Sequence, residues 1–430
     1  MADIRPLHTL RYEPSVAGPL QNLAAPPYDV IDSDERAALL ARSPYNVVAV
    51  DLPQPDSTSG QDQYEAAGAR FERWQQEGAL VREQEPALWA HTQEYTGPDG
   101  VRRTRRGFFC AVRIEEYGPG RVRPHERTHP GPKEDRLRLT RATRTNLSPI
   151  FSLYSDPQQA AWAALSPFTE QEPWGEVRDE DGTVHRIWRI ADPAAIDTVA
   201  RVLGASELLI ADGHHRYETA QAFAREAEAS GSSAGDDAYR YVLMCLVALE
   251  DPGLTVFATH RLVSGLDEQR RSALAATVER DFEIDDVATA ELAQIEHESG
   301  GPLELGLADQ RGEHAVRLRL KDQSIADTAL RGRSEAYRHL DTGVLEALLL
   351  TGPLGLSEDD ISHLRGFGYA RSTANALELL RSGEFDVAFL MRPTPVEQVK
   401  AVAEAGENMP PKSTYFFPKV LTGLVFNPLY

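Results

Sequence analysis

The stretch from Leu208 to Ala220 constrains the fold of this chain more than any other. It begins with the short apolar run Leu208–Ala211, which is typical of a buried strand. Asp212-Gly213 then breaks that run with the residues of a tight turn. Apolar residues recur beyond the turn at three- and four-residue spacing, at Tyr217, Ala220, Phe223, Ala224 and Ala227. The stretch therefore predicts a strand, a glycine turn and the N-terminus of a helix.

Four ionisable side chains crowd this predicted turn. The first turn of a helix has backbone N–H groups without an internal partner and the positive end of the helix dipole, so it suits an anion. Asp212, His214 and His215 supply one acid and two imidazoles, and the planar guanidinium of Arg216 matches phosphate or carboxylate. The alternative is an ordinary α/β junction with Asp212 as a helix cap. Two adjacent histidines between Asp-Gly and Arg favour a functional site.

The bulk composition limits the partners and the number of domains. At 430 residues the chain is too long for one ordinary core, so two or three domains are expected. A net charge of −21 argues against nucleic acid or an anionic membrane surface as a partner. Any anion site must therefore be a local basic pocket. We find no signal-peptide pattern, no apolar run of membrane length and only two cysteines, so we expect a cytoplasmic protein.

Residues 117–149 form a second dense motif. Prolines at 124, 130 and 132 predict a loop, because proline ends or kinks an ordinary helix. We expect an active-site loop that lays ionisable side chains over a ligand, and a solvated loop is the alternative. The candidate side chains are those of His125, Glu126, Arg127, His129, Lys133, Asp135 and Arg136. The spacing of His125 and His129 would suit two metal ligands on a helix, but the prolines weaken that hypothesis.

The carboxy-terminal segment is the third motif. Between Met409 and Lys419 it holds prolines, aromatic residues and two lysines, and the apolar run that follows must be docked on the protein. Lys412, Ser413 and Thr414 supply an ammonium and two hydroxyls that suit a phosphate, although the glycine frame of a Walker loop is absent. Lys419 offers a second ammonium.

Two further pairs of candidates lie at predicted strand ends. Tyr28 and Asp29 follow Pro26-Pro27, either in a rigid connector or facing a cleft. His260 and Arg261 end another strand, and a satisfied histidine at the edge of the core is the alternative to a pocket residue. A hairpin is predicted over residues 88–115. Its arginines are expected on a solvated face, namely Arg102, Arg103, Arg105 and Arg106.

The order of predicted elements suggests a mixed α/β chain with three parts. Residues 1–265 form a core that carries the loop 117–149, with a strand expected over residues 46–52. Residues 266–330 form a small α/β subdomain without a site. Residues 331–430, mostly helical over 357–383, return strands and the Lys412-Ser413-Thr414 motif to the core.

Three stretches together resemble one family. Pro26–Val30, Ala211–Ala220 and Met409–Lys419 look like the domain-of-unknown-function family 1015 of bacteria and archaea, and His125–Thr128 and Asp135-Arg136 fit as well. The resemblance spans nearly the whole chain and is weakest over residues 361–383. The family label implies no activity.

A wider resemblance implies more. Gly213–Tyr217 is similar to the phosphate-binding turn of the ParB/sulfiredoxin superfamily, and Asp212–Arg216 resembles its free-serine kinases. This implies a ParB/sulfiredoxin-like core that binds nucleotide or phosphate through Gly213, His215 and Arg216. It also implies that Asp212 or His214 is the acid–base group, that Glu13 or Asp29 is an N-terminal acid, and that the substrate resembles serine or phosphoserine.

We therefore expect a phosphotransferase or phosphohydrolase that acts on a small hydroxyl or phosphorylated metabolite. A nucleotide with Mg²⁺ is the candidate cofactor. The oligomeric state is left open, with a homo-oligomer as one candidate. The candidate catalytic residues are Asp212, His214, His215, His125 and Glu126. The candidate phosphate-binding residues are Gly213, Arg216, Arg127, Lys133, Lys412, Ser413, Thr414 and Lys419. The candidate cleft residues are Tyr28, Asp29, His129, Asp135, Arg136, His260 and Arg261.

Two other functions fit the same residues. One is a non-catalytic, nucleotide-binding regulatory protein, and the other is a metal-dependent hydrolase that uses Asp212, His214, His125 and His129. The Arg216→Ala substitution separates two roles of that arginine. If Arg216 binds phosphate, its loss abolishes ligand binding and leaves thermal stability nearly intact; if it forms a structural ion pair, its loss destabilises the fold.

Overall fold

The structure is a computed structural model that describes residues 2–55, 60–97, 99–128, 130–231, 237–297, 301–310 and 315–430. The chain divides into two compact units. Unit 1 comprises residues 1–124, 128–254 and 418–430, and unit 2 comprises residues 125–127 and 255–417. This division differs from the boundaries expected at residues 265 and 330. Strands from both sides of residue 330 pair in one sheet of unit 2, which joins those two segments.

Within the described residues, unit 1 is built on a nine-stranded mixed sheet. Its strands are β1 (Ile4–Arg5), β4 (Leu88–Thr96), β5 (Arg102–Arg113), β6 (Val122–Arg123), β8 (Ile150–Tyr154), β9 (Gly175–Arg178), β10 (Val184–Ile190), β11 (Leu208–Asp212) and β12 (Tyr241–Ala248). They follow the order β6-β11-β8-β12-β5-β4-β10-β9, with β1 beside β5. β11 is parallel to β6 and β12 is parallel to β8, whereas the neighbour pairs β11–β8 and β12–β5 are antiparallel. The expected mixed α/β fold is confirmed.

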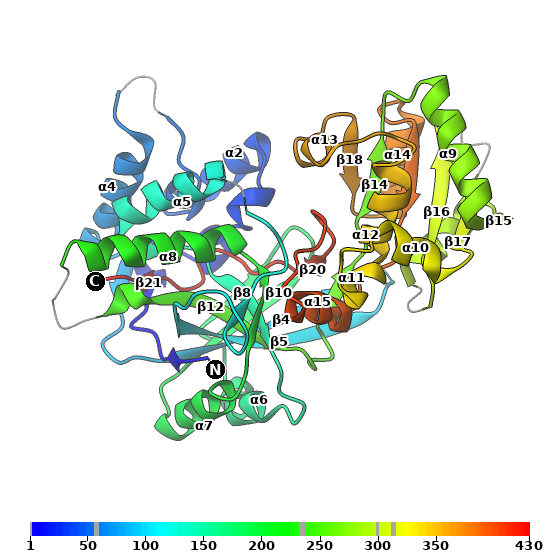
Figure 1. The fold of residues 1–430 in the computed structure, drawn as a ribbon. Coiled ribbons are helices and arrows are strands. Elements are labelled where there is room, and N and C mark those ends of the chain that lie inside the picture. Colours follow the sequence, from blue (N-terminus) through cyan, green and yellow to red (C-terminus); the bar gives the residue numbers. More distant parts are fainter. Residues whose placement is uncertain are drawn as a thin grey trace. The chain divides into compact units, whose positions relative to one another are not determined.

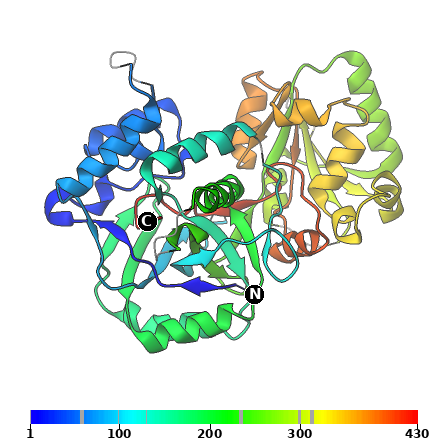
Figure 2. The same cartoon turned by 60° about the vertical axis from the view of Figure 1, so that its left-hand side comes forward.

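Helices cover both faces of this sheet (Figures 1 and 2). α5 (Pro130–Thr143) and α8 (His214–Ala229) lie over one face, with α4 (Gln63–Gln76) packed beside α5. α6 (Ala160–Leu165) and α7 (Pro193–Leu203) lie over the other face. Because both faces are covered, the middle strand β12 is apolar and buried along its whole length.

Shorter elements complete unit 1. They are α1 (Pro14–Ala17), α2 (Ser33–Arg42), α3 (Val48–Asp51), the 3₁₀ turns η1 (Leu20–Asn22), η2 (Tyr28–Val30), η3 (Ser166–Glu170) and η4 (Ala238–Arg240), and the strands β2 (Leu10–Tyr12), β3 (Leu80–Arg82), β7 (Thr145–Asn146) and β21 (Asn427–Pro428). β21 pairs with β7, so the chain's tail is docked as expected. No helix in the described part of the chain is both long and apolar enough to cross a membrane.

Unit 2 contains a six-stranded sheet in the order β15-β17-β16-β19-β14-β18, counted over the described residues. Its strands are β14 (His260–Val263), β15 (Phe282–Asp286), β16 (Glu304–Asp309), β17 (Ala315–Leu320), β18 (Phe367–Ala370) and β19 (Val387–Leu390), and a separate ribbon pairs β13 (Thr255–Phe257) with β20 (Tyr415–Phe417). Its helices are α9 (Glu268–Asp281), η5 (Thr289–His297), α10 (Gln323–Ala329), α11 (Glu335–Arg338), α12 (Asp341–Leu345), the π turn η6 (Glu346–Leu350), α13 (Glu358–Ser362), α14 (Thr373–Arg381) and α15 (Val396–Glu404).

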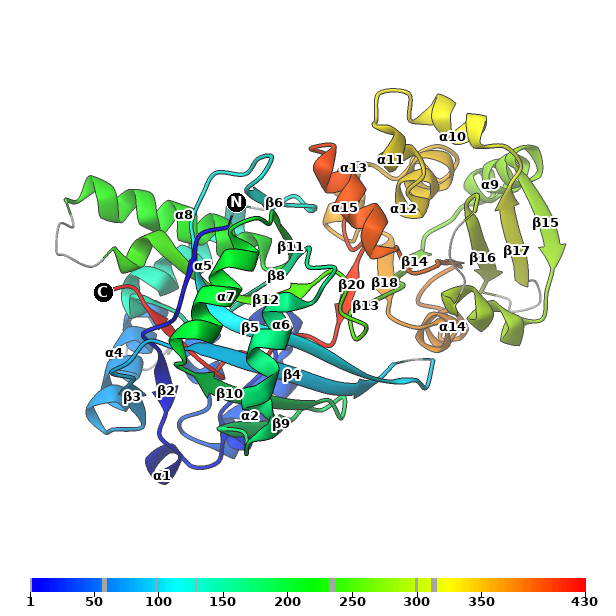
Figure 3. The ribbon, with the colours of Figure 1, turned by 90° about the horizontal axis from the view of Figure 1, so that it is seen from below.

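The sheet of unit 2 separates two apolar cores, because successive side chains of a strand point to opposite faces. Val263 of β14 packs in one core with α9 and α12, and the preceding Leu262 packs in the other core with α14. Figure 3 shows α9 and α14 on opposite sides of the strands.

The prediction of a loop over residues 117–149 is wrong for its second half. α5 begins at Pro130 and includes Pro132, so both prolines lie in its first turn. The backbone nitrogens of a first turn have no intrahelical acceptor, and proline therefore loses nothing there. His129 lies outside the described residues.

Two further predictions are wrong, and a third holds in part. Residues 48–51 form helix α3 in place of a strand, and the Asn46 side chain accepts a hydrogen bond from Val48 N at its start, 3.0 Å away. Residues 357–383 contain the helices α13 and α14, as expected, but also the strand β18, which pairs with β14. Arg105 is only 1% exposed where a solvated face was expected, because its guanidinium bonds to the side chain of Gln93 and to the Pro418 carbonyl.

Candidate functional site

The predicted strand, glycine turn and helix form as expected: β11 ends at Asp212, and α8 begins at His214. Gly213 between them has φ +99°, a left-handed conformation that side chains rarely adopt. A Cβ at this position would also lie 3.0–3.2 Å from the guanidinium of Arg216. Glycine is thus required for the turn and for the close approach of Arg216. Gly213 occupies the N-cap position of α8, so Asp212 lies one residue before the cap.

Two cations meet on the Asp212 carboxylate. Lys419 Nζ donates to Oδ1 at 2.7 Å, and Arg216 Nη2 donates to Oδ2 at 2.5 Å. Arg216 also donates from Nη1 to the carbonyl of Pro149. Lys419 comes from the tail, 207 residues away from Asp212 in the sequence. The three side chains of Asp212, Arg216 and Lys419 are 18%, 11% and 21% exposed, so they are mostly buried but reach solvent.

These contacts determine the charge of Asp212. Burial by itself would raise the pKa of the carboxyl, but the charges of Lys419 and Arg216 outweigh it and hold the pKa well below its ordinary value of 3.8. Asp212 is therefore an anion at neutral pH and a weak base. It aligns two cations at the start of α8, next to the buried ring of His214.

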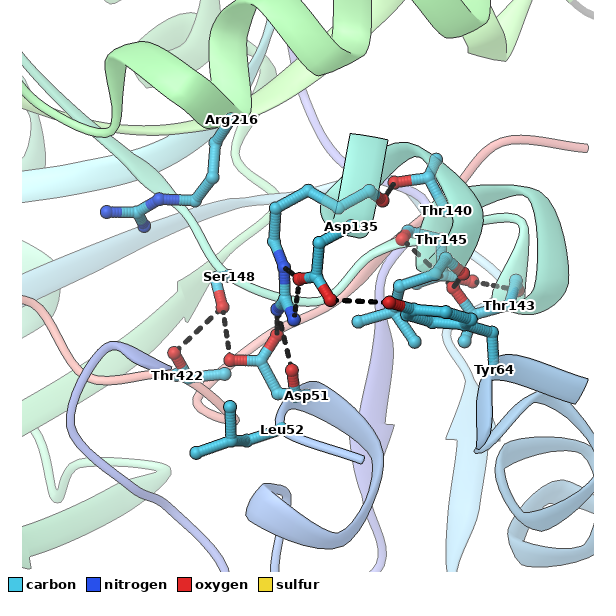
Figure 4. A network of polar contacts seen from close by, with 12 residues as sticks. Asp51, Leu52, Tyr64, Asp135, Thr140, Thr143, Thr145, Ser148, Arg216 and Thr422 are labelled. Atoms are coloured by element: carbon cyan, nitrogen blue, oxygen red, sulfur yellow. Dashed lines mark hydrogen bonds and ion pairs between the residues drawn. The ribbon is translucent and has the colours of Figure 1, made fainter. Parts of the chain in front are cut away.

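A second polar cluster lies nearby in unit 1, and Figure 4 shows it together with Arg216. Asp51, at the end of α3, is 5% exposed and accepts from Ser148 Oγ at 3.0 Å. Arg136 Nη1 donates to the Asp51 carbonyl at 2.6 Å and lies 3.4 Å from its carboxylate. Because the single hydroxyl proton of Ser148 goes to Asp51, Thr422 Oγ1 donates to Ser148 Oγ at 2.9 Å. Burial raises the pKa of Asp51, and Arg136 and Ser148 oppose that rise.

This second cluster borders a small cavity. Tyr28, Asp51, Arg136, Ser148 and Arg216 line a cavity of about 40 Å³. The guanidinium of Arg136 lies 4.1 Å from the centre of the Tyr28 ring, and burial raises the pKa of Tyr28 to about 12. A space of this volume fits a few water molecules and is too small for a nucleotide.

The remaining predicted residues of α5 are paired within unit 1. Lys133 Nζ donates to Glu218 of α8 at 2.9 Å, and Thr128 Oγ1 donates to the same carboxylate oxygen at 2.7 Å. Asp135 accepts from Tyr64 Oη at 2.6 Å and from Arg136 Nε at 2.7 Å. These contacts fasten α5 to its neighbours.

Other predicted residues belong to unit 2. His125 is fully buried, its Nε2 lies 2.9 Å from Thr414 Oγ1, and its carbonyl accepts from Met409 N at 2.8 Å. Ser413 is buried and its hydroxyl donates to the Pro410 carbonyl at 2.7 Å, which leaves it no role in an exposed phosphate cradle. Lys412 is exposed and has φ +55°.

The last three candidates also lie in unit 2. His260 Nδ1 accepts from Met391 N at 3.0 Å, so its Nε2 carries the proton and donates to Glu296 at 3.0 Å. His260 is thus a satisfied core-edge histidine. Burial by itself would raise the pKa of Glu296, but the hydrogen bonds from His260 and Thr373 outweigh it and lower that pKa to about 2. Arg261 is buried at the Pro411 and Lys412 carbonyls. The exposed Arg127 and Glu358 approach to 3.6 Å.

The structure therefore places the predicted residues in two units. Asp212, Arg216 and Lys419 are brought into contact in unit 1, whereas the histidine loop and the Lys412-Ser413-Thr414 motif belong to unit 2. Within the described residues, no group of three or more His, Cys, Asp or Glu could hold a metal ion. Glu126 of the same loop is half-buried in unit 2, and Asp29 is exposed in unit 1.

Sequence reasoning missed several polar residues that surround the site. They are Asp51, Gln93, Arg105, Ser148 and Thr422, all of them less than one tenth exposed. The sequence could have predicted the contact between Gln93 and Arg105, because these two long polar residues occupy facing positions of a predicted hairpin. The other three are single polar residues in apolar surroundings, and only contacts between distant segments identify them.

Comparison with known proteins gives one family and several solved structures. The family model described as "Protein of unknown function (DUF1015)" matches residues 4–343. No curated protein matches the chain. A free serine kinase in complex with AMP is 14% identical and aligns over 69% of this chain and 83% of its own, with a TM-score of 0.34. SbnI with a C-terminal truncation from Staphylococcus aureus is 12% identical, aligns over 75% and 87%, and has a TM-score of 0.36. A conserved hypothetical protein from Pyrococcus furiosus is 14% identical, aligns over 72% and 90%, and has a TM-score of 0.33. Likeness this weak says nothing of what this chain binds.

Proposed function

From the geometry of the site, we propose that this chain binds a phosphorylated small metabolite at the start of α8 and transfers the phosphoryl group. The chain belongs to the DUF1015 family, whose description names no activity. One observation carries the proposal: Lys419 and Arg216 converge on Asp212 beside the first turn of a sixteen-residue helix. In a chain of net charge −21, two mostly buried cations at one helix N-terminus form a local positive site.

The chemistry of phosphoryl transfer suits such a site. The transferred group carries its charge on three oxygens, so catalysis depends mainly on positioning and on neutralising that charge. Arg216 offers a planar fork of N–H donors and Lys419 a compact ammonium, which are the two usual cations for phosphate. The positive end of the α8 dipole adds to both.

We assign the acid–base role to His214 or His215 and a positioning role to Asp212. An imidazole titrates near neutral pH and exchanges a proton readily, whereas Asp212, with its lowered pKa, holds a proton poorly. Asp212 instead fixes the orientation of the two cations. Its ionised carboxylate is also a ligand type that Mg²⁺ accepts together with substrate phosphates.

The identity of donor and acceptor comes from the motif resemblance. The turn Asp212–Arg216 resembles that of the free-serine kinases, so the proposed donor is a nucleotide and the proposed acceptor a serine-like hydroxyl. A second reaction, in which water in place of a nucleotide takes the phosphoryl group from a phosphoserine-like ester, would use the same charges. A direct assay of both reactions separates them.

A ligand screen tests this function. Thermal shift with pyrophosphate, ATP, ADP, serine and phosphoserine is measured together with release of inorganic phosphate and formation of phosphoserine, with and without Mg²⁺. The test variants are Lys419→Gln and Arg216→Lys. The matched controls are Lys400→Gln and Arg141→Gln, which change a lysine and an arginine in solvent-exposed ion pairs.

We expect pyrophosphate and a nucleotide to stabilise the wild type and both controls, and to stabilise the two test variants much less. Phosphoserine formation identifies a kinase, and phosphate release from phosphoserine identifies a phosphatase. Binding without turnover of any acceptor identifies the nucleotide-binding regulatory protein. Equal stabilisation of test and control variants, or none in the wild type, contradicts a phosphate site at α8.

A further inference from the structure

Arg105 is a buried cation without an anion. It is 1% exposed, and among the described residues no carboxylate lies within ion-pair distance of it. Its Nη1 has no hydrogen-bond partner there. The face of the guanidinium lies over the Phe151 ring, whose centre is 4.5 Å away. An unpaired buried charge is costly, and apolar residues of similar volume are often at least as stable in such places. Stability of the sheet therefore does not explain Arg105.

The hydrogen bonds of Arg105 point to the tail. Gln93 on β4 and Arg105 on β5 are facing residues of the hairpin, and Gln93 Oε1 accepts from Arg105 Nε at 2.9 Å. Arg105 Nη2 donates to the Pro418 carbonyl at 2.5 Å, and Gln93 Nε2 donates to the Lys419 carbonyl at 2.9 Å. Two consecutive carbonyls of the tail are thus held by one buried side-chain pair.

The segment that they hold lies outside helices and strands. Pro418 and Lys419 follow β20, and no sheet ladder fixes their backbone. Yet Lys419 must keep its Nζ within 2.7 Å of Asp212. The Gln93–Arg105 pair supplies the fixed anchor that a strand would otherwise provide.

Unit 2 repeats this arrangement at the other lysine of the tail. Arg261 is 3% exposed and, among the described residues, has no carboxylate within ion-pair distance. Its Nη2 lies 3.4 Å from the Pro411 carbonyl and 3.2 Å from the Lys412 carbonyl, and its Nη1 donates to the Thr259 carbonyl. Lys412 has φ +55°, a left-handed conformation that a lysine rarely adopts without an outside restraint.

We propose that Arg105 and Arg261 are positioning residues that hold carbonyls of the two Pro-Lys pairs of the tail: Arg105 holds the Pro418 carbonyl so that Lys419 presents its ammonium group to an anionic ligand in unit 1, and Arg261 holds the Pro411 and Lys412 carbonyls and so orients the Lys412 side chain within unit 2. The part concerning Lys419 rests on the phosphate site proposed at α8. Both arginines act through the backbone of the lysine segment, and neither contacts the ligand. A buried arginine bonds to a backbone carbonyl at both Pro-Lys pairs, and this repetition argues against chance packing.

The small number of lysines makes a direct test possible. The chain has five, at positions 133, 321, 400, 412 and 419. Reductive ¹³C-methylation keeps the charge of each amine and gives one NMR signal per lysine, with Lys→Arg variants for assignment. The test variants are Arg105→Met, Arg261→Met and Gln93→Glu. Arg103→Met, two residues from Arg105 on the same strand, removes an arginine that pairs with Asp99 near the surface and serves as the control.

We expect Arg105→Met to move only the Lys419 signal, towards the position of the exposed Lys400, and Arg261→Met to move only the Lys412 signal. Gln93→Glu keeps Arg105 and gives it an anion, but it loses the donor to the Lys419 carbonyl, so the Lys419 signal moves while the fold is retained. This variant keeps the test decisive if Arg105→Met does not fold. Unmoved lysine signals in the folded variants, or the same movements in Arg103→Met, overturn the positioning role.

Ligand affinity supplies the second readout. Arg105→Met should weaken pyrophosphate binding roughly tenfold, whereas in a Lys419→Gln background it should have no further effect, because the arginine acts through that lysine. Additive losses in the double variant overturn the positioning role. If the Lys419 signal moves but no protein binds pyrophosphate, the proposed function has failed and the positioning role stands.

Discussion

The Asp212→Asn substitution tests the centre of the site. Asp212 accepts two charge-assisted hydrogen bonds, at 2.7 Å from Lys419 and 2.5 Å from Arg216. An asparagine keeps one oxygen for one cation and turns an N–H₂ group towards the other. One bond to a charged group, worth about 1.5–3 kcal/mol, is lost and the other weakens. Removing one partner of a fully buried pair costs about 3–5 kcal/mol. Because these side chains are 11–21% exposed, we expect a loss of about 3 kcal/mol in the free energy of unfolding, at the lower end of that range.

Calorimetry and urea unfolding at neutral pH measure this loss. For a unit of this size, about 2 °C of melting temperature corresponds to 1 kcal/mol, so the expected decrease is about 6 °C. Glu226→Gln is the matched control, since it converts a carboxylate to an amide in an exposed pair with Arg141 and should cost less than about 1 kcal/mol.

The pH dependence of stability tests the charge of Asp212. A lowered folded-state pKa means that the carboxylate stabilises the fold above its ordinary pKa of 3.8, and that this stability is lost as the pH falls through the folded-state pKa. The difference between wild type and Asp212→Asn should therefore stay constant from about pH 5.5 to pH 8. A variant as stable as the wild type refutes this account of the site. So does a difference in free energy of unfolding, between wild type and variant, that changes across neutral pH.

Three other predictions follow from single residues. Gly213→Ala should destabilise by about 2 kcal/mol more than Gly18→Ala, because both glycines have φ near +90° but only a Cβ at 213 meets Arg216; urea unfolding measures the difference. Burial lowers the pKa values of His91 and His185, so the unfolded chain binds protons that the folded chain does not, and stability should fall as the pH drops from about 7.5 to 5.5; a flat urea midpoint over this range would contradict it. Lys412→Gly should raise the free energy of unfolding by about 1 kcal/mol through relief of its positive φ, whereas Lys412→Gln, which keeps that conformation, should not.

The expectation for Arg216→Ala changes with the structure. The sequence left open whether Arg216 binds ligand or forms a structural ion pair. Because its guanidinium bonds to Asp212 and to the Pro149 carbonyl, its removal must lower stability. Arg216→Lys keeps the positive charge but loses the planar set of N–H donors, so it is the better variant for testing ligand binding.

The sequence alone determined the local features of this protein. The apolar run Leu208–Ala211, the turn Asp212-Gly213 and the helical spacing after it predicted β11, Gly213 and α8 correctly, because each depends on neighbours within one or two turns of chain. The family resemblance, confirmed over residues 4–343, rests on the same local motifs. Local patterns predicted a loop wrongly at prolines 130 and 132, because proline is compatible with a helix when it occupies the first turn.

Only the tertiary structure decided which charges meet. Nothing in the sequence near Asp212 points to Lys419, 207 residues later, and nothing near Arg105 points to the Pro418 carbonyl. Such contacts form because the sheet, its covering helices and the docked tail bring distant segments together. An ion pair leaves no periodic pattern in the sequence from which it could be predicted. The tertiary structure likewise turned Ser413 and His260 inward, since a buried hydroxyl or imidazole must find its hydrogen bonds within the fold.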